Sequence, residues 1–171
     1  MNDSEGRRFY GKYRGVVTEN DDSDANRGKK LGRIKAKVPD VFGDEESGWA
    51  MPCVPYAGKN VGMFFIPPKD SFVWIEFEHG DPEYPIWSGC FWGENEVPVS
   101  QYSPETKVLR TGVGTITVND SSGKAGITVE TKKGMKIIID DNGIEITNGK
   151  DAKVKLSGNT VAINGDALEV Q

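Results

Sequence analysis

Apolar and polar residues alternate in short runs throughout the last third of the chain, from Gly112 to Gln171. A spacing of two residues places both members of a pair on the same face of a β-strand. Residues that favour reversals, mainly glycine, asparagine and aspartate, stand between the runs. Seven aliphatic pairs predict seven short strands: Ile116/Val118, Ile127/Val129, Ile137/Ile139, Ile144/Ile146, Val154/Leu156, Val161/Ile163 and Leu168/Val170.

This segment has few residues with which to build a core of its own. No aromatic residue follows Tyr102, and no proline follows Pro104. A domain of about 60 residues with only aliphatic side chains inside would be marginally stable. We therefore expect residues 112–171 to form an intertwined β-prism or β-helical spike of three identical chains, with the first six pairs as its core. An ordinary small antiparallel domain is the alternative, whereas the irregular spacing of the pairs argues against a single-chain solenoid.

The first part of the chain predicts a different all-β domain. Five short strands are expected, at residues 9–18, 31–38, 62–66, 72–78 and 86–92, with 62–66 buried and with residues 48–58 closing one side. Such strands with glycine bends are typical of an OB-fold barrel. The expected organisation is a flexible N-terminus at 1–8, the barrel at 9–97, a linker at 98–111 and the spike at 112–171.

Charge argues against nucleic acid as a partner. The 171 residues carry a net charge of −5, and residues 1–100 hold 17 acidic and 12 basic side chains. Nucleic-acid binders usually show a basic excess. The basic strand face formed by Arg33, Lys35 and Lys37 is compatible with phosphate contact, with solvent exposure or with an acidic subunit. An OB barrel that stacks single-stranded bases on Phe64, Trp74 and Trp87 is kept as the alternative function.

Residue types suited to catalysis or metal binding are scarce. His79 is the single histidine, and Cys53 and Cys90 are expected to be buried free thiols. Aspartates at positions 21, 22 and 24 lack the closing glutamate of a calcium loop, which favours a solvated turn. We therefore expect no enzyme, no cofactor and no metal. No apolar run approaches membrane-spanning length and no signal peptide is visible, so synthesis in a bacterial cytoplasm is expected and a secreted adhesin is disfavoured.

Ordered motifs run from Tyr10 to about Gly93. They include Gly32-Arg-Ile-Lys-Ala-Lys-Val-Pro39, Trp49-Ala, Pro55-Tyr-Ala-Gly58, Gly62-Met-Phe-Phe-Ile-Pro67 and Phe77-Glu-His-Gly-Asp-Pro-Glu-Tyr-Pro85. This set resembles the OB-fold domain of the baseplate assembly protein V and tail-spike family of contractile phage tails, shared with VgrG-type spikes. The motif residues, read as structural, are Gly32, Arg33, Pro39, Trp49, Gly58, Gly62, Pro67, Gly80, Asp81, Pro82, Pro85 and Gly89.

The resemblance implies a mechanical role. Members of this family form a homotrimer beneath a contractile tube, and sheath contraction drives the spike through a target envelope. No lysozyme domain fits between barrel and tail, and no appended hub domain of the VgrG kind is visible, so the resemblance implies a separate hub protein. The His-x-His iron tip of some spikes is absent, which implies a PAAR-like tip protein at the C-terminal end. The expected location is a phage tail or tail-like particle. Lys69-Asp-Ser-Phe-Val73 departs from the family's usual Gly-Asp-Glu-Val turn.

Overall fold

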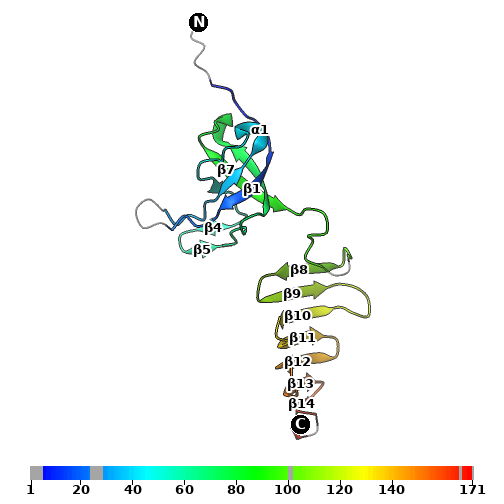
Figure 1. Cartoon of the computed structure of the whole chain (residues 1–171). Coiled ribbons are helices and arrows are strands. Elements are labelled where there is room, and N and C mark those ends of the chain that lie inside the picture. Colours follow the sequence, from blue (N-terminus) through cyan, green and yellow to red (C-terminus); the bar gives the residue numbers. More distant parts are fainter. Residues whose placement is uncertain (1–5, 24–28, 100–101, 166, 171) are drawn as a thin grey trace. The chain divides into compact units, whose positions relative to one another are not determined.

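The computed structural model describes residues 6–23, 29–99, 102–165 and 167–170. The chain divides into two compact units, Met1–Val97 and Pro98–Gln171, called unit 1 and unit 2 below. Nearly all regular structure in both units is β, as predicted (Figure 1). Within the described ranges, no helix has the length and apolar character needed to cross a membrane.

Unit 1 is built on a curled five-stranded sheet. Its strands are β1 (Tyr13–Glu19), β2 (Lys35–Lys37), β3 (Met51–Pro52), β6 (Phe72–Phe77) and β7 (Pro85–Phe91). Their order is β2-β1-β6-β7-β3, and every pair is antiparallel except β3 with β7. An additional bridge between Ile34 and Ala50 links the segment before β2 to the segment before β3. The first and last strands of the order are thereby joined, which gives the OB-like curl.

The core of unit 1 follows the predicted alternation. On β6, Val73, Ile75 and Phe77 are buried, whereas Trp74 and Glu76 between them are half-buried on the outer face. The prediction for this strand is therefore confirmed. The remaining core residues come from β1, β2, β7 and the loops beside them: Phe9, Val17, Ile34, Ala36, Val38, Ala50 and Trp87.

Short elements connect these strands. They are the one-turn helix α1 (Pro39–Phe42), the 3-10 turn η1 (Glu78–Gly80), and a hairpin of β4 (Ala57–Gly58) and β5 (Val61–Gly62). The prediction of a buried strand over residues 62–66 was wrong. Met63, Phe64 and Phe65 are 47%, 76% and 53% exposed, because β4 and β5 pair only with each other and lie outside the main sheet.

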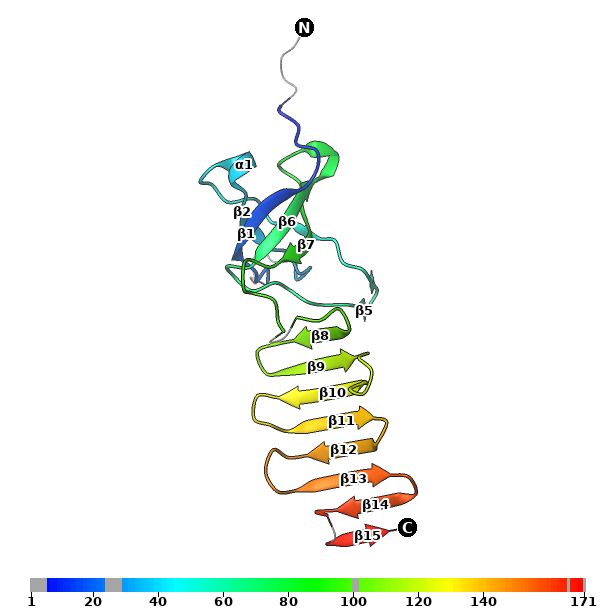
Figure 2. The same ribbon diagram turned by 90° about the vertical axis from the view of Figure 1, so that its right-hand side faces the viewer.

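Unit 2 is one eight-stranded antiparallel sheet in which each strand pairs with the next along the chain (Figure 2). The strands are β8 (Thr106–Arg110), β9 (Gly114–Asn119), β10 (Gly126–Thr131), β11 (Lys136–Asp140), β12 (Gly143–Thr147), β13 (Lys153–Ser157), β14 (Thr160–Ile163) and β15 (Leu168–Val170). The seven predicted pairs therefore all lie on strands. Unit 2 holds one strand more than predicted, because β8 occupies part of the expected linker 98–111.

Intertwining with other chains stays a prediction, and the single chain already forms one continuous sheet. Every described strand of unit 2 has its hydrogen-bonded neighbours in the same chain. The connections are short, since turns such as Asp141–Asn142 and Gly158–Asn159 place two residues between paired strands. Gly143 shows how tight the ladder is. Its φ is +124°, and a Cβ there would lie 1.9 Å from the carbonyl oxygen of Leu156.

Candidate assembly surface

The apolar pairs of unit 2 line up across neighbouring strands in two ladders. Because side-chain direction alternates along each strand and the register keeps pair opposite pair, both ladders lie on one face. We call it the apolar face. The first ladder consists of Leu109, Ile116, Val129, Ile137, Ile146, Val154 and Ile163. The second ladder consists of Val118, Ile127, Ile139, Ile144, Leu156 and Val161.

The opposite face of the same sheet is mainly polar. Thr117, Thr128, Glu145 and Lys155 occupy its central row, together with Ile138 and a few small or aliphatic residues. Ion pairs cross it between Lys136 and Glu130, and between Lys153 and Glu145, each with an N–O distance of 3.1 Å. Charged pairs of this kind suit a solvent-facing surface, and the sheet is therefore amphipathic.

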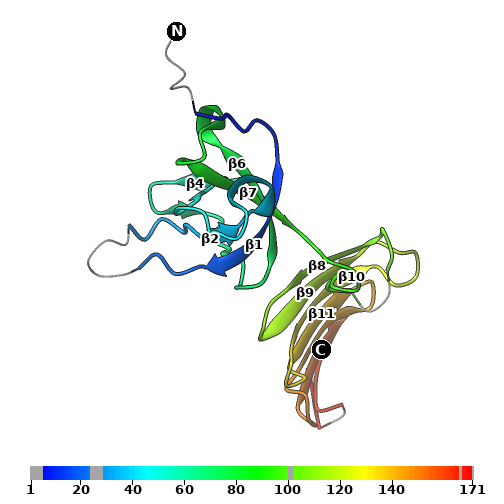
Figure 3. The same cartoon turned by 45° about the horizontal axis from the view of Figure 1, so that its top comes forward.

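The apolar face is uncovered in the single chain. Ten ladder residues are between 36% and 46% exposed, and the other three are half-buried. Unit 2 consists of one curved layer (Figure 3), whereas a stable domain needs a second layer over the apolar side of a sheet. Soluble monomers rarely expose apolar patches of this extent. The face is therefore built to be covered by another polypeptide.

All twelve residues predicted for the trimer core lie on this face. Leu109 also belongs to it, but the prediction missed this residue because β8 was assigned to the linker. Lys107-Val-Leu-Arg110 does not alternate between polar and apolar residues, so the pattern gave no signal of period two for this strand. The first ladder is therefore one residue longer than the sequence predicted.

Gly32 is buried in unit 1, beside Ile66 and Phe64. Its φ is +73°, and a Cβ there would lie 2.7 Å from Cδ1 of Ile66. The buried indole nitrogen of Trp87 donates a hydrogen bond of 3.1 Å to the Gly32 carbonyl oxygen. Trp87 is only 4% exposed, so its ring is not available to stack on a nucleic-acid base.

Arg33 forms a buried ion pair with Asp22. The distance from Arg33 Nε to Asp22 Oδ2 is 2.9 Å, and the same carboxylate accepts a hydrogen bond from the backbone N–H of Leu31. Burial alone would raise the pKa of Asp22, but these hydrogen bonds hold it below its usual range. Asp22 is 6% exposed, so the prediction of a solvated turn was wrong for this residue. Asp24 lies outside the described residues.

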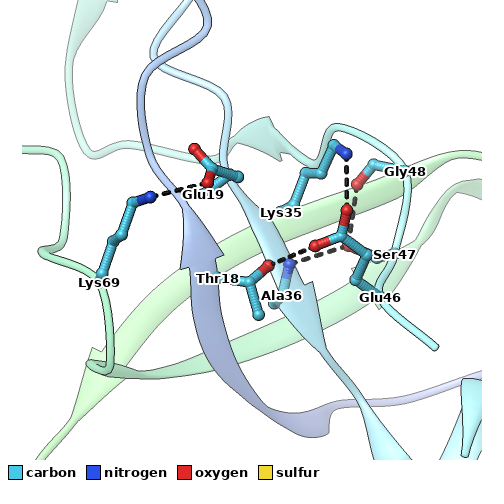
Figure 4. A network of polar contacts seen from close by, with 8 residues as sticks. All are labelled: Thr18, Glu19, Lys35, Ala36, Glu46, Ser47, Gly48 and Lys69. Carbon is cyan, nitrogen blue, oxygen red and sulfur yellow. Dashed lines mark hydrogen bonds and ion pairs between the residues drawn. The ribbon is translucent and has the colours of Figure 1, made fainter. Parts of the chain in front are cut away.

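Two cations of the neighbouring segment lie close to the ring of Trp49. The Arg33 guanidinium and the Lys35 ammonium lie 5.6 Å and 5.5 Å from its ring centroid. Lys35 also bonds Glu46 Oε1 at 2.7 Å, and Thr18 donates to the other Glu46 oxygen at 2.9 Å (Figure 4). These contacts hold the pKa of Glu46 below its usual range. The charges of Arg33 and Lys35 are thus balanced inside unit 1.

The loop from Gly80 to Pro85 joins the N-terminal segment to the sheet. Gly80 is buried at φ +73° beside the Tyr10 ring, and its carbonyl accepts the Phe9 N–H at 2.8 Å. Asp81 bonds Arg8 at 2.9 Å and accepts the backbone N–H of Glu83 at 3.1 Å. Pro82 lies in the turn, and Pro85 is buried at the start of β7.

The other motif residues mark turns and strand ends. Pro39 opens α1, and Pro67 accepts a hydrogen bond from the Asn20 side chain at 3.0 Å. Gly58 and Gly62 belong to the β4–β5 hairpin, where a Cβ on Gly62 would lie 2.8 Å from the Tyr56 carbonyl oxygen. Gly89 lies opposite Trp74, beside the point where the β6–β7 register shifts. These positions fit the structural role predicted for the motif residues, which stays a prediction.

The side chains considered for catalysis are not gathered into a site. His79, Cys53 and Cys90 are exposed, so the cysteines are free as expected but not buried. Partial desolvation raises the pKa of the Cys90 thiol, which disfavours the reactive thiolate. In the part of the chain that the structure describes, no three His, Cys, Asp or Glu residues are grouped to hold a metal ion.

Two family models match this chain, one for each unit. The type VI secretion system/phage-baseplate injector OB domain matches residues 13–92. The phage baseplate V C-terminal trimerisation domain matches residues 106–169. The second match begins at β8 and covers both apolar ladders, so an independent comparison assigns association of chains to the segment whose apolar face is uncovered.

Two curated relatives come from Vibrio cholerae serotype O1. The type VI secretion system spike protein VgrG3 is 27% identical over 128 residues, which is 68% of this chain and 13% of that protein. The actin cross-linking toxin VgrG1 is 31% identical over 123 residues, which is 65% of this chain and 11% of that protein. The chain therefore spans about an eighth or less of the length of these relatives.

Proposed function

We infer that this chain, which belongs to the spike family of baseplate V and VgrG-type proteins, is a structural spike component that works as a homotrimer. The observation that carries this proposal is the amphipathic sheet of unit 2, whose two apolar ladders lie on one uncovered face. Three copies that turn this face inward around a common axis would bury all ladder residues and leave the polar face outside.

Such an assembly has the mechanical properties that a spike requires. Every strand of the sheet is hydrogen-bonded to its neighbours along the length of the unit, so only the short end strands β8 and β15 have a free side with which other chains could pair. We propose that the trimer forms the needle of a contractile phage tail or tail-like particle. In this proposal, sheath contraction drives it through the target envelope.

The proposed partners occupy the two ends of the spike. A hub protein would bind through unit 1, where Tyr56, Met63, Phe64 and Phe65 form an exposed apolar segment around the β4–β5 hairpin. A PAAR-like tip protein would cap the C-terminal end of the needle. Replacing Phe64 and Phe65 with serine would weaken capture of a separately purified hub protein while leaving the trimer intact. Unchanged capture would exclude the hairpin as the hub contact.

We propose no catalytic role for this chain. The family is a structural one, and the match to VgrG1 covers 11% of that toxin. Binding of single-stranded nucleic acid is the less favoured alternative, since the net charge is −5 and Trp87 lies in the core.

The absolute mass in solution tests the proposal. Light scattering on a sizing column should give three times the chain mass of 18.7 kDa. A chain that ends after Val97 keeps the complete unit 1 core and should be monomeric. A monomeric full-length chain would refute the needle and would make retention on single-stranded DNA at low salt the next measurement.

A further inference from the structure

The turns of unit 2 lie alternately on two opposite edges of the sheet (Figure 2). The first edge carries the β8–β9, β10–β11, β12–β13 and β14–β15 turns, and the described residues of the last turn, Asn164, Gly165 and Ala167, are uncharged. The second edge carries the β9–β10, β11–β12 and β13–β14 turns. This division follows from the meander itself, because each strand reverses direction at the end opposite to the previous reversal.

The two edges carry opposite charge. On the first edge the exposed charged residues of the described chain are Arg110, Lys132, Lys133 and Lys150, opposed by Asp151. On the second edge they are Glu105, Asp120, Asp140 and Asp141, opposed by Lys107 and Lys124. One of these opposing charges is already neutralised, since Lys107 pairs with Asp120 across β8 and β9. The first edge is therefore basic and the second acidic.

Each edge carries one pair of adjacent charged residues that form no ion pair within the described part of their own chain. Lys132 and Lys133 on the β10–β11 turn form no ion pair with any described residue, and the same holds for Asp140 and Asp141 beside the β11–β12 turn. All four residues are exposed. Their charges are free to act on a neighbouring molecule.

We propose that the basic edge of one copy packs against the acidic edge of the next copy, so that three heterologous contacts close the ring. The inference rests on the proposed homotrimer and adds which edge of one copy meets which edge of the next. In the proposed trimer the three-fold axis runs perpendicular to the strands, in the direction in which successive strands follow one another. The same strand therefore lies at the same height along the axis in every copy. The β10–β11 and β11–β12 turns differ in height by one strand spacing, about 4.8 Å. Lys132 and Lys133 would therefore lie within reach of Asp140 and Asp141 of the adjacent copy.

The same charges disfavour one alternative assembly, a two-fold symmetric dimer whose sheets are joined along an edge. In a two-fold symmetric dimer each surface meets its own copy, so joining the sheets along an edge would bring lysines against lysines or aspartates against aspartates. Like charges at such close range repel. A head-to-tail ring is the arrangement in which every edge contact is between opposite charges.

Charge reversal tests the proposal in the intact chain. One variant carries Lys132→Glu and Lys133→Glu, a second carries Asp140→Lys and Asp141→Lys, and a third carries all four changes. A matched control carries Lys29→Glu and Lys30→Glu, two adjacent exposed lysines of unit 1 with the same change in charge. Urea-induced dissociation of the trimer is followed by light scattering, and circular dichroism reports the sheet content of each variant.

The first two variants should each dissociate at a lower urea concentration than the unchanged protein, because attraction becomes repulsion at all three contacts. With exposed pairs each worth a few-fold in affinity, the association constant should fall by at least about 100-fold. The four-residue variant should return to the unchanged midpoint, and the Lys29/Lys30 control should stay there. The differences should shrink between about 0.01 M and about 1 M salt, where the Debye length falls from about 30 Å to about 3 Å.

A trimer whose midpoint is unchanged in both edge variants would overturn the proposal, and so would a four-residue variant that is weaker than either parent. Both results would leave the homotrimer itself standing. A monomeric unchanged protein would instead refute the proposed function. An equimolar mixture of the two single-edge variants should assemble less well than the four-residue variant, because an odd ring of two chain types must contain one contact between like edges.

Discussion

Ile139 offers the sharpest test of the apolar face. It lies near the middle of the second ladder on β11, between Ile127 of β10 and Ile144 of β12. In the single chain it is 43% exposed. We predict that Ile139→Asp abolishes the trimer, and that Ile146→Asp on the first ladder does the same.

The expected loss can be worked out from burial. Because a fully buried isoleucine side chain contributes about 1.5–3 kcal/mol, covering the exposed part of Ile139 contributes about 1 kcal/mol per chain, or about 3 kcal/mol per trimer. Burying the carboxylate costs several kcal/mol per copy, three times over. The total exceeds about 10 kcal/mol, which corresponds to a factor of about 10⁷ in the association constant.

The neighbouring residue supplies a matched control. Ile138 lies on the same strand but on the polar face, opposite Thr128 and Glu145. Ile138→Asp introduces the same chemical change and adds a like charge beside Glu145, which costs at most about 1 kcal/mol. This variant should remain a trimer.

Light scattering over a range of protein concentrations, together with circular dichroism, decides between these outcomes. Trimers of unchanged stability in Ile139→Asp would refute the assignment of this face to the interface. Equal disruption by Ile138→Asp would refute it as well, because the effect would then not depend on the face.

Four further predictions concern the folded units themselves. Arg33→Ala should destabilise unit 1 by about 3 kcal/mol, because it leaves the buried Asp22 carboxylate without its cation; fluorescence of the tryptophans, all in unit 1, reports this unfolding. Because the pKa of Asp22 is lowered by folding, its stabilising contribution should be complete above about pH 4 and disappear as pH falls through the folded-state pKa, so acid titration of Asp22→Asn should show a smaller loss. Gly143→Ala should destabilise unit 2 in urea by several times the cost of Gly158→Ala, whose Cβ would enter open space; equal midpoints would contradict the close approach at Gly143. Trp87→Phe should cost about 1–3 kcal/mol by leaving a buried carbonyl without its donor, and an unchanged melting temperature would argue against that hydrogen bond.

Local pattern was enough to predict β6 and the strands β9–β15 with the turns between them. On β6 and on the seven strands β9–β15, the alternation of apolar residues gave the correct face for every described side chain in the predicted pairs, because strand geometry repeats every two residues. Turn residues such as Gly143 were equally readable, since their backbone conformation depends on the residue itself. The motifs of unit 1 carried the resemblance to the spike family, and the family models agree with it.

What covers each strand was decided only by the tertiary structure. Phe64 and Phe65 are large apolar residues of the kind found in core strands. They are nevertheless exposed, because the hairpin before them lies outside the main sheet. Asp22 stands in a polar stretch that is typical of a solvated loop. It is nevertheless buried, where it forms an ion pair with Arg33 of the adjoining segment. Periodicity cannot distinguish these cases, since burial depends on residues that are distant in the sequence.

The sequence by itself therefore determined that unit 2 would be a series of amphipathic strands with an apolar face in need of a partner. The tertiary structure decided that these strands pair within one chain as a single layer. It also gathered the lysines and aspartates of successive turns on opposite edges. The physical reason is that backbone dihedral angles within a few residues set the face on which a side chain lies and the position of each turn. The number of layers and the residues that share an edge of the sheet depend instead on how eight strands are ordered in space.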